Sequence, residues 1–161
     1  MFREPRVRVR PTAFPLVLAL LLLAAPAAFP QSVTGYATAG FTQGCVADSE
    51  TLCLNDNRFA VTAGFQLTPS GPTYQATAMP LTADSGYFWF FDPNNVELVV
   101  KVLNGCFDPF NTYWVFAAGL TNVGVELVVT DTRTQETKIY VNEIGTPFQP
   151  IQDTGAFRAC P

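Results

Sequence analysis

The hydrophobic pattern of the chain is densest between Gly86 and Leu103, which reads GYFWFFDPNNVELVVKVL. Side chains of an extended chain point alternately to opposite faces. The aromatic residues of the first half therefore divide into two sets, namely Tyr87, Trp89 and Phe91 on one face and Phe88 and Phe90 on the other. Both faces are apolar, which predicts a strand that is buried on both sides or that carries an exposed aromatic strip.

The second half of this stretch predicts a partner strand. Asp92-Pro93-Asn94-Asn95 has turn chemistry, because proline fixes φ and Asp and Asn hydrogen-bond to their own backbone. The residues that follow form one aliphatic face, made of Val96, Leu98, Val100 and Val102, and one mixed face, made of Glu97, Val99, Lys101 and Leu103. Their β-branched content favours a strand over a helix. We expect a hairpin with a four-residue turn, and a β core organised on it.

Further segments of the chain alternate or carry β-forming residues in the same way. They are Phe59–Gln66, Tyr74–Thr82, Tyr113–Ala118, Val125–Thr130 and Lys138–Asn142. Pro80 assigns the second of these to a sheet edge, because proline cannot donate to a ladder. Short turns or loops separate the segments, and Gly145–Pro161 is a Pro-rich tail. About seven short strands without a helical period predict an all-β fold, an antiparallel β-sandwich.

This sandwich is expected to be immunoglobulin-like in architecture only. In antibody domains a tryptophan follows the first bridging cysteine at a set distance, and a tyrosine precedes the second by two residues. Neither tryptophan nor any tyrosine of this chain meets that spacing.

The amino end has the three parts of a secretory signal peptide. Four arginines between positions 3 and 10 form a basic region, Leu16–Ala25 is an unbroken apolar run, and Ala25-Pro26-Ala27 is an A-x-A cleavage site. A membrane anchor is the alternative, but it needs about 20 apolar residues. We expect residues 1–27 to be removed, residues 28–44 to form a flexible linker, and residues 45–161 to form one β-sandwich domain.

The charge of the chain narrows the classes of partner. The whole chain has nine basic and thirteen acidic residues, and removal of the leader with its four arginines and Glu4 leaves five against twelve, a net charge of −7. The basic residues that remain are scattered. Nucleic acid and anionic membrane surfaces are therefore unsuitable partners, and no membrane insertion is expected once the leader is removed.

Four cysteines, at positions 45, 53, 106 and 160, are an even number in a chain with an export signal, which predicts disulfides. Three connectivities are possible. Cys45–Cys53 with Cys106–Cys160 is favoured, because the first bridge closes a short loop and the second ties the carboxyl end to the core. The alternative joins Cys53 to Cys106 across the core as in antibody domains, but Cys106 follows the turn signal Asn104-Gly105.

Several segments together resemble a family. They are Leu52-Cys53-Leu54 with Arg58-Phe59, the run from Asp84 to Phe91, the run from Asn95 to Leu103 with Gly105-Cys106, and Tyr113–Phe116 with Gly119-Leu120-Thr121. They resemble an uncharacterised β-rich domain of exported proteins from environmental bacteria, over roughly Cys45 to Pro161. The resemblance implies export and a β domain, and it implies no activity. Phe65 stands where this resemblance would place a tryptophan.

The residues offer little catalytic chemistry. Histidine is absent, which excludes Ser-His-Asp and Cys-His catalysis. Asp84-Ser85-Gly86 and Asp153-Thr154-Gly155 have the form of aspartic protease triplets. Each such triplet needs its own β lobe, and these two lie too close in sequence for that, so we interpret them as turns. A glycosidase pair drawn from scattered acids is equally unsupported.

Two loops carry oxygen ligands that could suit calcium. They are Asn55-Asp56-Asn57 and Asp92–Glu97, and neither has the spacing of an EF-hand. Ordinary solvated turns are the favoured interpretation. No metal and no cofactor are predicted.

Aromatic side chains are the remaining candidates for binding. Tyr87, Trp89, Tyr113 and Trp114 could form a platform for sugar rings or a partner protein. For Trp89 and Trp114 the favoured interpretation is that they fill the core.

The sequence therefore predicts a secreted, extracellular or periplasmic protein, non-catalytic, that binds an unknown protein or glycan. The alternative is a carboxylate-dependent hydrolase, of the glycosidase or protease-like kind.

Overall fold

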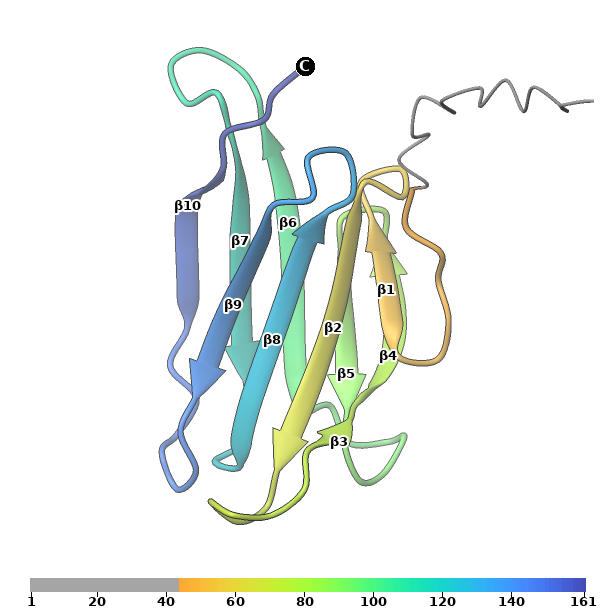
Figure 1. The fold of residues 1–161 in the computed structure, drawn as a ribbon, viewed down its shortest axis with the longest axis vertical. Coiled ribbons are helices and arrows are strands. Elements are labelled where there is room, and N and C mark those ends of the chain that lie inside the picture. The colour runs from red at the N-terminus through yellow and green to blue at the C-terminus, as the bar shows by residue number, and fades with distance from the viewer. Residues whose placement is uncertain (1–43) are drawn as a thin grey trace, which may run out of the picture. The chain divides into compact units, whose positions relative to one another are not determined.

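The computed structural model of the chain describes residues 44–161, and this part is all-β. Its strands form two antiparallel sheets that face each other as a β-sandwich (Figure 1). No helix long and apolar enough to cross a membrane occurs in residues 44–161. The predicted signal peptide 1–27, and the predicted linker 28–44 apart from Gly44, lie outside the described residues.

The first sheet, called sheet I here, has the order β1-β2-β8-β9, and β3 also pairs with β2. Its strands are β1 (Thr51–Leu54), β2 (Phe59–Gln66), β3 (Tyr74–Gln75), β8 (Gly124–Asp131) and β9 (Thr137–Asn142). The second, called sheet II, has the order β10-β7-β6-β5-β4. Its strands are β4 (Thr77–Thr82), β5 (Ser85–Trp89), β6 (Leu98–Gly105), β7 (Thr112–Gly119) and β10 (Ile151–Phe157).

The core lies between the inner faces of the two sheets. Strand alternation is regular in β2, whose residues are buried and half-buried in turn. The largest side chains that are fully enclosed come from both sheets, and they are Leu52, Leu54, Phe59, Val61, Phe88, Leu98, Val100, Val102, Val115, Leu127, Val129 and Phe157. The predicted aliphatic face of the hairpin is thus confirmed for Leu98, Val100 and Val102, each with 0% exposure.

The central hairpin exists, but its connection is longer than predicted. Gly86 pairs with Val100 and Phe88 with Leu98, so that Phe90 to Glu97 form the link between β5 and β6. The prediction that Val96 begins the strand is therefore wrong. Val96 is half-buried in the connection, and the next residue, Glu97, is buried although it was assigned to the mixed face.

Three segments depart from the predicted elements. Tyr74–Thr82 is not one strand, because β3 pairs with β2 in sheet I while β4 pairs with β5 in sheet II. The chain crosses between the sheets at Ala76, whose N–H donates to Ala63 O at 2.8 Å. β1 and β10 were not predicted as strands, since β1 is short and β10 lies in the tail assigned as Pro-rich.

The two sides of the sandwich are closed in different ways. On the side of β1 and β4, backbone hydrogen bonds join the sheets, from Ala78 N to Ser49 O at 2.8 Å and from Asn55 N to Ala83 O at 2.7 Å. On the side of β9 and β10, the Tyr140 hydroxyl donates to Asp153 Oδ2 at 2.9 Å. The β9–β10 side thus has a side-chain bridge where the other has backbone bonds.

The disulfides have the favoured connectivity. Cys45 is bonded to Cys53 and Cys106 to Cys160, with Cα atoms 5.5 Å apart in each pair. The Cys53–Cys106 bridge of the antibody type is absent, because Cys53 and Cys106 have other partners. The second bridge holds the carboxyl end against the loop after β6.

Burial along β6 predicts a sharp contrast between two neighbouring residues. Val100→Asp would bury an unpaired charge and should lower the free energy of unfolding by roughly 3–5 kcal/mol. Lys101 makes only a 3.9 Å ion pair with Asp84 and its side chain is 45% exposed, so Lys101→Asp should cost far less. A cost of about 0.5 kcal/mol is expected for such a surface change. Urea melts measure both, and equal losses would show that the register of β6 is wrong.

Candidate functional site

The outer face of sheet II carries most of the aromatic residues singled out in the sequence. Tyr87 and Trp89 alternate with buried residues on β5 and lie on this outer face. Trp114 occupies the same face on β7 and is half-buried. The expectation that Trp89 and Trp114 fill the core is therefore wrong, because strand alternation gives the core positions to their neighbours.

Tyr113 is not part of this face. It points between the sheets with 4% exposure and its ring lies 4.9 Å from that of Phe59. A surface platform that includes Tyr113 is thus excluded by its burial. Of the four predicted platform residues, three share the outer face and one belongs to the core.

Trp114 is the centre of an aromatic cluster. Ring centroids of Phe110, Phe107 and Phe116 lie 5.1, 6.3 and 6.4 Å from it. Its indole N–H donates to Thr112 Oγ1 at 2.9 Å, which fixes the orientation of the ring. A Cβ on Gly105 would lie 2.7 Å from the indole, so glycine is required there for the ring to lie against β6.

The phenylalanines of this cluster were missed in the sequence. Phe107 and Phe110 belong to the loop between β6 and β7, and about half of each side chain is exposed, 53% and 52%. Their position relative to Trp114 depends on how the loop folds back, which no local pattern of the sequence predicts.

A shallow apolar hollow lies beside Phe116 on the same face. Its volume is about 260 Å³, and it is lined by residues of β6, β7 and the start of β10, among them Val99, Lys101, Phe116, Ala118, Pro150 and Gln152. Lys101 is the charged residue of this lining, and its Nζ is 3.9 Å from Asp84 Oδ2. The outer face therefore combines large apolar rings with few charges.

A second aromatic cluster lies at the Phe65 end of the sandwich. The ring of Phe65 stacks on Phe90 at 4.6 Å, and Phe91 and Tyr74 lie 5.2 and 5.4 Å from it. Phe65 itself is buried, whereas Phe91 and Tyr74 are exposed. A phenylalanine where the family resemblance would place a tryptophan is accommodated by these ring contacts.

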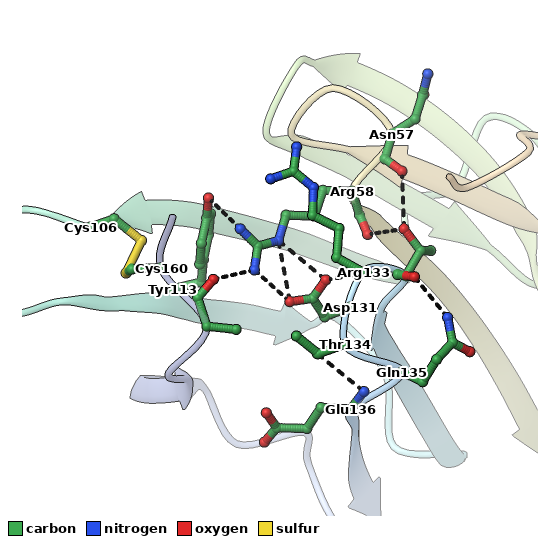
Figure 2. Close-up of polar contacts among 12 residues, drawn as sticks. Asn57, Arg58, Cys106, Tyr113, Asp131, Arg133, Thr134, Gln135, Glu136 and Cys160 are labelled. Atoms are coloured by element: carbon green, nitrogen blue, oxygen red, sulfur yellow. Dashed lines mark hydrogen bonds and ion pairs between the residues drawn. A yellow bond between two sulfur atoms is a disulfide. The ribbon is translucent and has the colours of Figure 1, made fainter. Parts of the chain in front are cut away.

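The most concentrated polar cluster is buried and centres on Arg58 (Figure 2). Its guanidinium Nη2 lies 2.6 Å from Asp131 Oδ2, and Nε lies 3.2 Å from Asp131 Oδ1. Nη1 donates to the Tyr113 hydroxyl at 2.9 Å, and Nη2 also donates to Ala159 O. The cluster therefore ties β2 and β8 of sheet I to β7 of sheet II and to the tail beside the Cys106–Cys160 bridge.

Charges within this cluster are mutually stabilised. Burial opposes ionisation of Asp131, but hydrogen bonds from Arg58 and from Arg133 N hold the pKa of Asp131 below its ordinary value of 3.8. Burial likewise opposes the charge on Arg58, and the Asp131 carboxylate raises the pKa of Arg58. Each nitrogen of the guanidinium has a partner already in place, so we interpret this cluster as a structural ion pair.

The two D-[ST]-G triplets do not meet. Asp84 lies in the turn before β5, where its side chain accepts from the Thr82 hydroxyl. Asp153 lies on β10, where it accepts from Tyr140 and from Gly155 N at 3.1 Å. β6 and β7 lie between β5 and β10, which at about 4.8 Å per strand places the triplets roughly 14 Å apart. Two carboxylates that far apart cannot share a proton.

Two other acids share a hollow on sheet I. Glu126 and Glu143 line a cleft of about 270 Å³ together with Gln66, Thr73 and Ile144. Both glutamates are exposed to solvent. Glycosidases place the catalytic acid in an apolar pocket, and this cleft does not enclose either carboxylate. A carboxylate-dependent hydrolase would have to use Glu126 and Glu143 in this cleft as its catalytic pair.

The two candidate calcium loops are turns, and their polar side chains form hydrogen bonds within the protein. Asn55, Asp56 and Asn57 all have positive φ, and Asn55 Nδ2 donates to Val102 O at 2.7 Å. Asp92 Oδ1 accepts from Asn94 N at 2.8 Å, as in an Asx turn. Within residues 44–161 no group of three or more Cys, Asp or Glu is placed so as to hold a metal ion.

No family model, curated protein or solved structure that was compared with the chain matches it.

The Arg58–Asp131 pair predicts a specific loss of stability in acid. Because the folded pKa of Asp131 lies below the unfolded value, its stabilisation is fully present above pH of about 4 and is lost as pH falls through the folded pKa. At pH 7, Asp131→Asn should lower the free energy of unfolding by roughly 3–5 kcal/mol, since it leaves Arg58 buried without a counterion. Urea melts from pH 7 to pH 2 should show this gap closing in acid.

Asp84→Asn is the matched control for this experiment, because Asp84 is a partly exposed acid whose ion pair with Lys101 is long. Its effect should be small at every pH. A gap between wild type and Asp131→Asn that stays constant down to pH 2 would contradict the ion-pair assignment.

Proposed function

We propose that this protein is an exported, non-catalytic binding module of the cell envelope or extracellular space, and that the outer face of sheet II is its binding surface. One observation supports this more than any other. Trp114 with its aromatic neighbours, and Trp89 toward the opposite end of the sheet, lie on a face that the core does not use. Aromatic residues that remain accessible to water on a sheet face are typical of binding surfaces.

The chemistry of the face suits two kinds of ligand. Aromatic rings offer large apolar areas whose faces stack on flat partners. Sugar rings and the apolar centre of a protein interface both meet this description, and the small number of charges favours an uncharged contact area. Polar groups such as Gln152 and Lys101 at the hollow beside Phe116 would provide orientation.

The proposed compartment of the protein follows from its predicted signal peptide and its disulfides. Two disulfides are typical of proteins in oxidising compartments. We propose that residues 1–27 are a cleaved signal peptide and that residues 45–161 act outside the cytoplasm, either in the periplasm or outside the cell. The acidic charge argues against nucleic acid as a partner. The resemblance to a domain of exported bacterial proteins supports the same interpretation, and immunoglobulin-like remains a description of architecture.

A carboxylate-dependent hydrolase is the alternative, and the cleft with Glu126 and Glu143 is the observation that favours it. Catalysis there would need one carboxyl group to be protonated near neutral pH, which enzymes achieve by enclosing it. The open cleft lacks that enclosure. Binding by the aromatic face is therefore the better supported function.

Trp114→Ala should weaken binding of whichever ligand a glycan array or a secretome pull-down with the wild-type protein identifies. Truncation of a central aromatic anchor typically costs 2 kcal/mol or more, so a rise in Kd of about 30-fold is expected by titration calorimetry. Leu67→Ala is the matched control, because Leu67 is an exposed apolar residue of the loop after β2, in sheet I. It should leave Kd unchanged.

The same preparation tests the alternative. Loss of affinity in the control as well as in Trp114→Ala would indicate non-specific hydrophobic binding. Turnover of a bound glycan that Glu126→Gln abolishes would establish the hydrolase instead.

A further inference from the structure

β9, at the edge of sheet I, is less protected from pairing with another chain than the other edge strands of the sandwich. β4 carries Pro80 within it, and β1 has only four residues. β10 loses its register with β7 between Asp153 and Phe157. Proline, short length and bulges are devices that prevent an edge strand from pairing with another chain. β9 has six residues and pairs with β8 in unbroken register, and its one charged residue, Lys138, is already paired with Glu136.

The backbone groups that point outward from β9 can be assigned. Asp131 N donates to Glu136 O at 2.9 Å, so Asp131 and Glu136 form a hydrogen-bonded pair at the start of the hairpin. Such pairs alternate with non-hydrogen-bonded pairs along an antiparallel ladder. With Thr130 opposite Thr137 and Val128 opposite Ile139, the N–H and C=O groups of Thr137, Ile139 and Val141 point away from β8.

These outward groups are accessible. Ile139 and Val141 are 57% and 64% exposed, and within the described residues no other backbone group bonds to them. A groove of about 540 Å³ runs along this edge, lined by Tyr140, Val141, Glu143, Phe148, Pro150 and Ile151 among others. The segment after β9 thus forms a second wall opposite the free edge, and the groove is deep enough to be lined by Phe148, which is buried.

We propose that β9 accepts an extended peptide from a partner protein as an added strand, with apolar residues at alternate positions and basic residues at its ends. The backbone of Thr137, Ile139 and Val141 supplies the ladder, as in other cases of strand addition. Alternate side chains of the peptide would cover Ile139 and Val141. This surface is separate from the aromatic face of sheet II, and the proposal does not depend on that face binding anything.

Charge decides between a foreign peptide and a second copy of the chain. Glu136 and Glu143 flank β9 at its two ends, and Lys138, the basic residue of the strand, already lies 3.3 Å from Glu136. Two β9 strands paired antiparallel about Ile139 would place Glu136 of one copy opposite Asn142 of the other, at the same end of the strand pair as Glu143 of that copy. The two copies would also bring together chains that each have thirteen acidic and nine basic residues, and such like net charges repel. A peptide with basic ends meets the same carboxylates favourably.

The experiment uses protein expressed from the full sequence and the fluorescein-labelled peptide KVTVTVTK as the probe. Fluorescence anisotropy should show saturable binding. Ile139→Pro removes an outward N–H and leaves the ladder to β8 intact, because proline is tolerated where the N–H faces solvent. It should raise Kd by about tenfold or more, since backbone hydrogen bonds of the added strand are lost.

Two matched variants separate backbone pairing from apolar contact. Ile139→Thr keeps the N–H and should raise Kd much less than Ile139→Pro, and Val46→Ala, an exposed apolar change beside β1 at the opposite edge of sheet I, should leave Kd unchanged. The probe N-methylated at alternate residues on its pairing edge should not bind wild-type protein. This last comparison keeps the test intact if the proline variant fails to fold, which a urea melt would reveal.

Three results would overturn the proposal. One is no binding of the probe at millimolar concentration. Another is equal binding of the N-methylated probe, which would indicate apolar contact without strand addition. The third is a dimer of wild-type protein in analytical ultracentrifugation that Ile139→Pro dissociates, which would show that a second copy occupies the edge.

Discussion

Strand alternation is the constraint on which the rest of this structure depends. Each strand of sheet II has one face toward the core and one toward solvent. If one residue points into the core, the next residue along the strand therefore points toward solvent. Val100 and Val102 are enclosed while Lys101 between them is half exposed. Because Phe88 on β5 and Tyr113 and Val115 on β7 already occupy the inner face, the tryptophans that alternate with them are left outside. The proposed binding surface is thus a consequence of how the core is filled.

The polar cluster around Arg58 has a different role from the apolar core. A buried ion pair contributes little net stability, because desolvation offsets most of the attraction. Its geometry nevertheless specifies one arrangement, since the guanidinium contacts Asp131 of sheet I, the Tyr113 hydroxyl of sheet II and Ala159 of the tail. Together with the Cys106–Cys160 bridge it fixes where the tail lies, and with it the position of β10 at the edge of sheet II.

The predictable parts of the fold were those set by local pattern. Alternation located β2, β6, β7 and β8, and loop closure distinguished the Cys45–Cys53 bridge from the bridge across the core. The crossing at Ala76 could not be predicted, because nothing local distinguishes a strand that changes sheets from one that does not. β10 was obscured by the prolines that precede it, at positions 147 and 150. The assignment of Trp89 and Trp114 to the core failed because average burial was given more weight than the alternation of β5 and β7.

The positions of the candidate site residues were likewise predictable only where local strand alternation determines them. Tyr87, Trp89 and Trp114 share a face because they occupy alternate positions on strands of one sheet, which a correct topology would have predicted. Tyr113 turned inward because it is adjacent to Trp114 and so must point to the other face. Phe107 and Phe110 reach Trp114 through the fold of a loop, and the open edge at β9 depends on which strands pair. Both are tertiary properties that no sequence pattern encodes locally.

The central claim is that the core of this sandwich leaves its tryptophans on an outer face. The chain contains two tryptophans, so its indole fluorescence reports on Trp89 and Trp114 alone. Acrylamide quenching of the folded protein, repeated with Trp89→Phe and with Trp114→Phe, measures the accessibility of each. We predict that each indole is quenched in the folded state to a substantial fraction of its value in urea. Blue-shifted emission and suppressed quenching of both indoles would place them in the core and contradict the account.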